Sequence, residues 1–311
     1  MDPFSGESGK PHPSHSGRPL TASELLNIST AFYTHAYPAV LSYDVSSLSE
    51  TNRTTAQHLK YRAQIAVGDT SVLSTLESAK DAPSRSILAL AQHAAGNSAG
   101  VETALSLADS DAEDSTVQIC AGTVLAAAGE HAKAIELLSK HQGSLEAVAI
   151  LTQVHLSQNR SDLAMKEVAT AKRWAQDSLL INLAEAWVNL RIGPSEKYQS
   201  TFYVYEELAS TPGSTSPTSL VGQAIAEIHL GRYEEAEAAL NQAMETENVD
   251  VEALANSVVL ASVLGKKSDE VQGLLEQLRA RNENHVLLQD LEEKSQLFDT
   301  AAAKYTPKVA S

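Results

Sequence analysis

Apolar residues recur every three to four positions in residues 220–244, which is the spacing of one face of an α-helix. Gly231 interrupts the pattern, and glycine readily takes the left-handed backbone conformation of a turn that ends a helix. The spacing resumes at Ala236, Leu240 and Ala243, with glutamates on the opposite side. The segment therefore predicts two helices joined by a tight turn, with small side chains that let the helices approach closely.

The same hairpin pattern recurs along the chain. Gly265 lies 34 residues after Gly231, which is the length of a tetratricopeptide repeat. Gly129 and Asn159 are each followed by mostly small or apolar residues at the offsets found after Gly231. Such hairpins cannot bury their apolar faces alone, so several copies predict a stacked array. More degenerate copies are expected nearer the N-terminus.

These repeats predict an all-α fold, a right-handed superhelical array of tetratricopeptide-like helical hairpins, or α-solenoid. Residues 1–20 are rich in serine, proline and glycine and have little to bury, so they predict a disordered tail. Residues 21–311 are expected to form a single solenoid. Its last helix, at about residues 285–304, is expected to cap the open end of the array.

Charge and composition exclude several classes of partner. The formal net charge is −16, from 39 acidic and 23 basic residues, and no cluster of lysine and arginine is present. Nucleic acid and anionic lipid need such clusters and are therefore not expected as direct ligands. No apolar run is long enough to span a membrane, so no direct membrane insertion is expected. A single cysteine, Cys120, and the lack of a signal-peptide pattern favour a cytosolic protein.

No catalytic chemistry is predicted by the sequence. It has no glycine-rich phosphate loop, nucleophile elbow, HExxH motif or paired-cysteine metal site. His93, His131, His141 and His155 stand singly on predicted helices, where structural or surface roles are more common than catalysis. We therefore expect no catalytic residue, no cofactor and no metal.

A candidate binding groove follows from the repeat register. In tetratricopeptide arrays the first helix of each hairpin lines the concave side, and positions two, three, six and ten before the turn residue point into it. The apolar residues predicted there, called the groove residues below, are Val221, Ile225 and Ile228 before Gly231, Val259 and Val263 before Gly265, and Ile181 and Val188 in the preceding hairpin. A contiguous apolar stripe indicates either a partner site or a closed interior. The alternative is that these residues are ordinary core.

Several segments distributed over nearly the whole chain carry a more specific resemblance. They are Ala31-Phe32-Tyr33 with Tyr37, Gly143-Ser144-Leu145-Glu146-Ala147, Leu183-Ala184-Glu185-Ala186-Trp187-Val188, Gly222-Gln223-Ala224, Phe298-Asp299 and Tyr305-Thr306-Pro307. With these segments the chain resembles the epsilon subunits of coatomer. The resemblance is looser in the N-terminal half than in residues 143–307.

The resemblance implies a non-enzymatic subunit of the COPI vesicle coat that binds the C-terminal region of the alpha subunit. It also implies a cytoplasmic protein, peripheral on Golgi membranes and COPI-coated vesicles, that acts in Golgi-to-endoplasmic-reticulum retrieval and transport within the Golgi.

Two other functions fit a helical repeat array, because the repeat itself occurs with many functions. A chaperone-linked adaptor would bind a partner's acidic C-terminus with lysine, arginine and asparagine in its groove. A regulatory subunit of an enzyme complex would have a similar sequence pattern. Isolation of the native protein with its partners would separate these cases from a coat subunit.

Overall fold

The computed structural model describes residues 24–210, 216–245 and 250–305, and all regular secondary structure in these ranges is α-helical. The predicted tail of residues 1–20 lies outside them. The helices are α2 (Leu26–Tyr33), α3 (Tyr37–Ser42), α4 (Glu50–Ala66), α5 (Ser71–Leu76), α6 (Ala82–Ala94), α7 (Ala99–Ser110), α8 (Ser115–Ala127), α9 (His131–Leu138), α10 (Leu145–Ser157), α11 (Ser161–Lys172), α12 (Leu179–Ile192), α13 (Ser195–Ser210), α14 (Pro217–Leu230), α15 (Tyr233–Met244), α16 (Val251–Val263), α17 (Ser268–Arg281) and α18 (Val286–Ala302).

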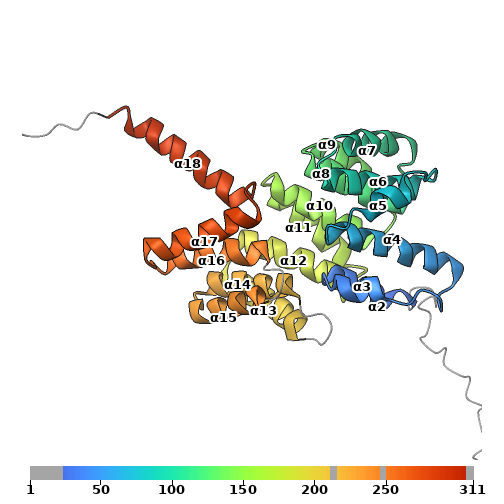
Figure 1. The fold of residues 1–311 in the computed structure, drawn as a ribbon. Helices are drawn as coiled ribbons and strands as arrows, with labels where there is room; N and C mark the ends of the chain where they lie inside the picture. Colours follow the sequence, from blue (N-terminus) through green and yellow to red (C-terminus); the bar gives the residue numbers. More distant parts are fainter. Residues whose placement is uncertain (1–23, 211–215, 246–249, 306–311) are drawn as a thin grey trace, which may run out of the picture.

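The helices form consecutive antiparallel hairpins, with an even-numbered first helix and an odd-numbered second helix in each (Figure 1). The turn residues predicted from the sequence all have positive φ: 82° at Gly129, 58° at Asn159, 75° at Gly231 and 64° at Gly265. Asparagine tolerates this conformation better than most residues other than glycine. This explains why Asn159 can occupy the turn position that glycine holds in the other three hairpins. The predicted all-α array of tetratricopeptide-like hairpins is confirmed.

Neighbouring hairpins stack mainly through the first helix of the later hairpin, which contacts both helices of the hairpin before it. α6 packs on α8, α8 on α10, α10 on α12, and α14 on α16. The step from α12 to α14 differs, because there α13 makes the close contact with α14. The Tyr205 ring of α13 lies directly against Gly222 of α14, where a Cβ atom would collide with the ring. Gly222 therefore permits this contact between the two hairpins.

Small residues fill the helix crossings of the core. Ala224, Ala236 and Ala243 are fully buried where α14 and α15 meet, together with Leu240. Ala164 is equally buried where α11 meets α12. Close-packed interiors tolerate neither extra atoms nor voids, so these alanines fix how closely α14 approaches α15 and α11 approaches α12.

A buried ion pair connects hairpins that are far apart in the sequence. The Arg62 guanidinium on α4 pairs with the Glu146 carboxylate at the start of α10, and the Tyr33 hydroxyl on α2 donates to the same carboxylate at 3.2 Å. The Arg62 and Glu146 side chains are only 13% and 14% exposed. Burial alone would lower the pKa of Arg62, but the charge and hydrogen bond of Glu146, with smaller contributions from Cys120 and Tyr33, together raise the pKa above its ordinary value. Arg62 also lies over the Phe32 ring, 4.6 Å from its centre.

A second long-range contact joins the N-terminal hairpin to the C-terminal half. The His35 Nδ1 and the Thr218 Oγ1, at the start of α14, are 3.1 Å apart. The array therefore curves so far that its first hairpin reaches helices that follow it by well over a hundred residues. In Figure 1 the N-terminal half (blue to green) and α13–α17 (yellow to orange) lie on either side of α10–α12.

The final predicted helix is α18. Its first turn packs on the last hairpin, where Leu288 is buried against Leu254, Ala255 and Leu278. Beyond that turn the helix leaves the body as an arm (Figure 1).

We expect Ala236→Leu to destabilise the chain by about 1 to 3 kcal/mol, because the larger side chain overpacks the α14–α15 crossing. Ala238→Leu is the matched control, since Ala238 is exposed on the same helix. Thermal melting of both variants measures the difference. Equal melting temperatures would contradict the assigned packing.

We expect Arg62→Met to cost about 3 kcal/mol or more in free energy of unfolding, because it leaves the Glu146 charge buried without its partner. Arg62→Met combined with Glu146→Leu should recover much of this loss. Arg160→Met is the control, because its ion pair with Asp162 is exposed and should contribute little to stability. Urea unfolding measures all three, and a loss at Arg62 as small as that at Arg160 would refute a buried, structural ion pair.

Candidate partner-binding surface

Three of the seven groove residues lie in the hydrophobic core. Ile181 and Val188 of α12 pack against α10 and α11, with exposed fractions of 0% and 3%. Val221 of α14, 5% exposed, packs in the cluster that joins α14 to α15 and α16. Their side chains are already covered by the chain itself. At these positions the structure matches the ordinary-core alternative rather than an open stripe.

The turn after α12 explains why Ile181 and Val188 lie in the core and not in the groove. The chain passes from α12 into α13 through Gly193 and Pro194 alone, and Gly193 (φ 69°, ψ −162°) lacks the left-handed helical conformation of the turn residue Gly231. Counting back from a turn residue therefore selects a different face of α12. That face is the one packed on α10 and α11.

The other four groove residues are accessible to different degrees. Ile225 and Ile228 of α14 are half-buried against the same cluster as Val221. Val259 and Val263 of α16 are 38% and 52% exposed and lie one helical turn apart. Leu264, which follows α16, is 40% exposed. The apolar surface available to a partner is thus a short strip on α16 with a half-buried edge on α14.

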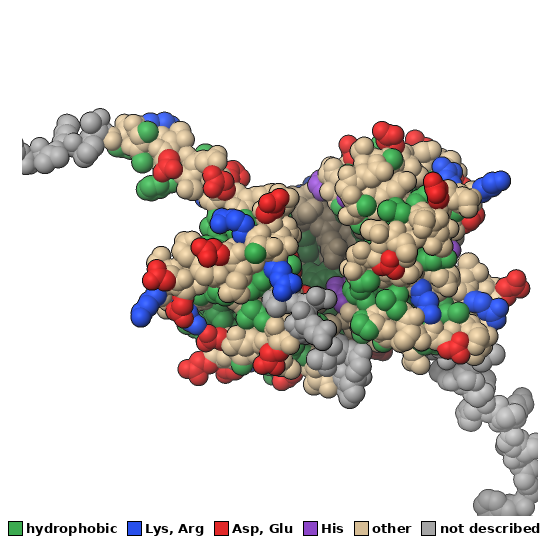
Figure 2. Space-filling view, in the orientation of Figure 1, with side chains coloured by type: hydrophobic (Ala, Val, Ile, Leu, Met, Phe, Trp, Pro, Cys, Tyr) green, Lys and Arg blue, Asp and Glu red, His purple; other side chains and the backbone are tan. Residues whose placement is uncertain are grey.

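A larger concave feature, which the sequence analysis missed, lies nearer the N-terminus. This N-terminal cleft has a volume of about 1170 Å³ and lies between α2 with α4 and the first turns of α8, α10 and α12. Its lining includes Leu26, Thr55, His58, Ile119, Leu145 and Leu179. The face drawn in Figure 2 has a hollow between the C-terminal hairpins and the N-terminal half. Hydrophobic side chains lie within this hollow.

The Arg62–Glu146 ion pair forms part of the wall of the N-terminal cleft. The pair holds α2 and α4 opposite the start of α10, and so sets the width of the opening. Residues 31–33 and 143–147, two of the segments that carry the family resemblance, meet at this point. The family signal therefore pointed to these residues, although no physical argument from the sequence alone paired Arg62 with Glu146.

Two of the three helix starts that border the cleft, those of α8 and α10, have backbone N–H groups satisfied by their own caps, whereas Ser178 before α12 makes no side-chain cap bond. The Asp114 carboxylate accepts from Thr116 and Val117 at 2.8 and 3.0 Å, and Ser144 Oγ accepts from Ala147 at 3.2 Å. These amide groups are not free to hold a phosphate or carboxylate. The remaining lining contains both apolar residues and serine and threonine hydroxyls, a composition suited to an extended polypeptide.

The titratable groups near the cleft do not form a catalytic arrangement. Burial lowers the pKa of His58, which favours its neutral form near pH 7. Burial raises the pKa of Cys120 to about 11, so this buried thiol stays protonated and is a poor nucleophile. Within residues 24–210, 216–245 and 250–305, no group of three or more histidine, cysteine, aspartate or glutamate side chains is placed to hold a metal ion. No helix of the described chain is long and apolar enough to cross a membrane.

Solved structures with a similar fold are helical repeat proteins. A chain of the APC/C hetero-tetramer Cut9–Hcn1 matches with a TM-score of 0.61 and 16% identity, over 88% of this chain and 55% of that chain. A tetratricopeptide repeat protein from Parabacteroides merdae matches with a TM-score of 0.57 and 13% identity, over 75% of this chain and 94% of that chain. At such identities these similarities support the fold alone.

Protein sequences give a more specific result. The probable coatomer subunit epsilon of Schizosaccharomyces pombe is 30% identical over 287 residues, covering 91% of this chain and 96% of the relative. The coatomer subunit epsilon of Caenorhabditis elegans is 28% identical over 290 residues, covering 91% and 98%. The coatomer epsilon subunit family profile matches residues 21–306. With this profile spanning both the N-terminal cleft and the α16 strip, the chain belongs to the coatomer epsilon subunit family.

Proposed function

We propose that this COPI coat subunit is a non-enzymatic scaffold that binds the C-terminal region of the coatomer alpha subunit on its concave side. The observation that carries the proposal is the pairing of a large cleft, about 1170 Å³, with an exposed apolar strip on α16. The steps in which the coat would use this contact are Golgi-to-endoplasmic-reticulum retrieval and transport within the Golgi.

The chemistry of the two surfaces favours an extended segment of the partner. Hydroxyl groups in the cleft can bond to a peptide backbone, while Leu26, Ile119 and Leu145 can contact apolar side chains. On α16, the partner would cover Val259 and Val263 and so remove them from water. Apolar burial contributes about 25 cal/mol per Å² before the cost of association. The net charge of −16 disfavours a strongly acidic segment.

The non-enzymatic assignment rests on what the cleft residues do. Arg62 is committed to Glu146, and Cys120 is buried with a raised pKa. Neither residue is available as a reacting group. The surroundings of the cleft therefore support binding and positioning rather than catalysis.

Membrane association would be peripheral and would come through other coat subunits. The acidic charge and the lack of a lysine and arginine cluster disfavour direct binding to anionic lipid. On this proposal the protein would be cytoplasmic and peripheral on Golgi membranes and COPI-coated vesicles.

The chaperone-adaptor alternative fits the surface less well. It requires free cationic or amide side chains in the groove, whereas the exposed groove residues are apolar and Arg62 is neutralised by Glu146. The other alternative, a regulatory subunit of an enzyme complex, can be distinguished from a coat subunit by isolating the native assembly. Coatomer subunits, rather than an enzyme or a chaperone, should accompany the protein.

We expect the double substitution Val259→Asp and Val263→Asp to abolish association with the alpha subunit, because two buried carboxylates would have to lose their hydration at the interface. Both side chains are exposed in the free chain, so helical content and melting temperature should be nearly unchanged. Co-precipitation with the C-terminal region of the alpha subunit, together with circular dichroism, measures both effects.

The matched control places the same substitutions at Met165 and Tyr203, which are 43% and 59% exposed on the second helices α11 and α13. This control variant should bind as the wild type does. A folded Val259→Asp, Val263→Asp variant that still binds would move the partner to another face. An unfolded one would assign these valines to the core.

A further inference from the structure

A pocket opens between the second helices α15 and α17, with α16 as its floor. Its volume is about 340 Å³. Leu260 and Ala261 of α16 and Leu240 of α15 are buried at its base, and Leu274 of α17 lines the opposite side. The base is therefore apolar and suits an apolar side chain rather than a hydrated ion.

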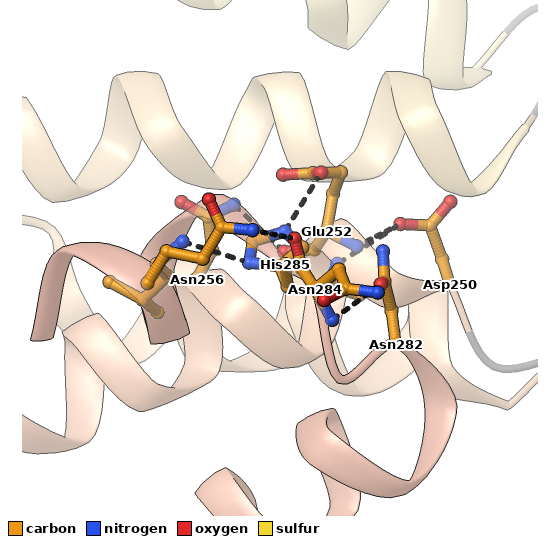
Figure 3. Close-up of polar contacts among 9 residues, drawn as sticks. Asp250, Glu252, Asn256, Asn282, Asn284 and His285 are labelled. Atoms are coloured by element: carbon orange, nitrogen blue, oxygen red, sulfur yellow. Dashed lines mark hydrogen bonds and ion pairs between the residues drawn. The ribbon is translucent and has the colours of Figure 1, made fainter. Parts of the chain in front are cut away.

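Contacts at both ends of α17 keep this α15–α17 pocket open. Lys266, shortly before α17, pairs with Glu237 on α15. Beyond the other end of α17, His285 Nε2 lies 3.1 Å from Glu252 Oε1 on α16 (Figure 3). Leu278 is buried in the same corner. Because α17 is fixed at both ends, the pocket is formed before any ligand arrives, which lowers the ordering cost of binding.

Gly273 of α17 lines the pocket without a close packing contact. At three other helical glycines, Gly100, Gly122 and Gly222, a Cβ atom would collide with a neighbouring helix. At Gly273 a Cβ atom would meet nothing within 4 Å. Glycine inside a helix is less stable than alanine, so this position loses helix stability without gaining a close approach. What the glycine provides is open space in the pocket.

The outer edge of the pocket is acidic. It carries the carboxylates of Glu237, Asp269 and Glu270 and one cation, Lys266, which is already paired with Glu237. Among the described residues Asp269 makes no ion pair, and Glu270 interacts with Lys266 only at longer range. Both side chains are exposed. The edge therefore has two carboxylates that a cationic group of a ligand can reach.

Size and charge together select the ligand. The pocket runs along α15 from Glu237 to Met244, a length of about 10 Å, which matches about three residues of an extended chain. Residues two apart on such a chain point to the same side, so one side chain can enter the apolar base while the other reaches Asp269 and Glu270. Arginine suits this edge, because its planar guanidinium forms paired hydrogen bonds with a carboxylate. The net charge of −16 disfavours an acidic peptide or a second copy of this chain.

We infer that the α15–α17 pocket binds an extended segment of another protein in which an apolar side chain and an arginine stand two residues apart. The apolar side chain lies on Leu240 and Leu260, where it is removed from water. The arginine pairs with Asp269 or Glu270 at the edge.

The pocket is separate from the exposed strip on α16. Ser257 and Ala261 line the pocket, whereas Val259 and Val263 form the strip. Positions two residues apart on a helix differ in direction by about 200°, so the two surfaces lie on different sides of α16. The inference therefore goes beyond the proposed contact with the alpha subunit and adds a second interaction site.

The test measures the fluorescence anisotropy of a short labelled peptide of serine and glycine that carries one leucine, with an arginine two residues before it and another two residues after it. Titration with the full chain should give a dissociation constant in the micromolar range. Replacing the leucine with serine, or both arginines with glutamate, should weaken binding at least about tenfold. No binding of the leucine peptide, or equal binding of the leucine and serine peptides, would refute the inference.

Gly273→Leu fills the pocket from α17 and should weaken binding of the leucine peptide at least about tenfold. Because leucine favours helices more than glycine does and the space is open, the melting temperature should not fall. Gln272→Leu is the matched control, since Gln272 is exposed on α17 outside the pocket, and it should bind as the wild type does. Wild-type affinity in Gly273→Leu would place the peptide elsewhere and overturn the inference.

The acidic edge is tested by Asp269→Asn with Glu270→Gln, which should weaken binding at least about tenfold. The control pair, Glu102→Gln with Glu113→Gln, removes the same charge from exposed positions on α7 and in the loop after it, and should bind as the wild type does. Equal weakening by both pairs would mean that net charge alone attracts the peptide, which contradicts the inference. Sedimentation that shows a wild-type dimer and a monomeric Gly273→Leu variant would instead assign the pocket to a second copy.

Discussion

The buried ion pair between Arg62 and Glu146 is the constraint on which the shape of the concave side depends. Local packing of alanines holds each hairpin together, but it acts only between neighbours, as in any repeat array. The ion pair joins α4 to α10 and brings α2 with it through Tyr33. Because a buried charge without its partner is costly, the two helices cannot separate easily. The N-terminal cleft exists because this contact closes the curve.

Local features of the fold could be predicted from the sequence, and long-range ones could not. Four hairpins could be predicted from their turn residues Gly129, Asn159, Gly231 and Gly265. A positive φ favours glycine or asparagine, and helical periodicity is visible in the spacing of apolar residues. The pairing of Arg62 with Glu146 spans 84 positions and has no periodic signature. It depends on the accumulated rotation of the stacked hairpins, which a single sequence does not specify.

The exposure of the groove residues was predicted only in part for the same reason. Val259 and Val263 are on an exposed face, as the repeat register indicated, because a regular turn at Gly265 follows them. Ile181 and Val188 are core residues, and the register does not carry over to them because the Gly193–Pro194 link after α12 has another conformation. The direction of α18 was also beyond the sequence, since it depends on contacts with the preceding hairpin, such as His285 with Glu252 and Leu288 with Leu254. Family resemblance pointed to coatomer, and the relatives and the family profile confirm membership.

Site-specific photo-crosslinking tests most directly whether the concave side receives the coatomer alpha subunit. A photoreactive residue would replace Thr55 in the cleft, Val263 on α16, or Tyr203 on a second helix as the reference position, since all three side chains are exposed. With the C-terminal region of the alpha subunit present, the account predicts crosslinks from positions 55 and 263 and none from position 203. Crosslinks from position 203 alone would contradict it.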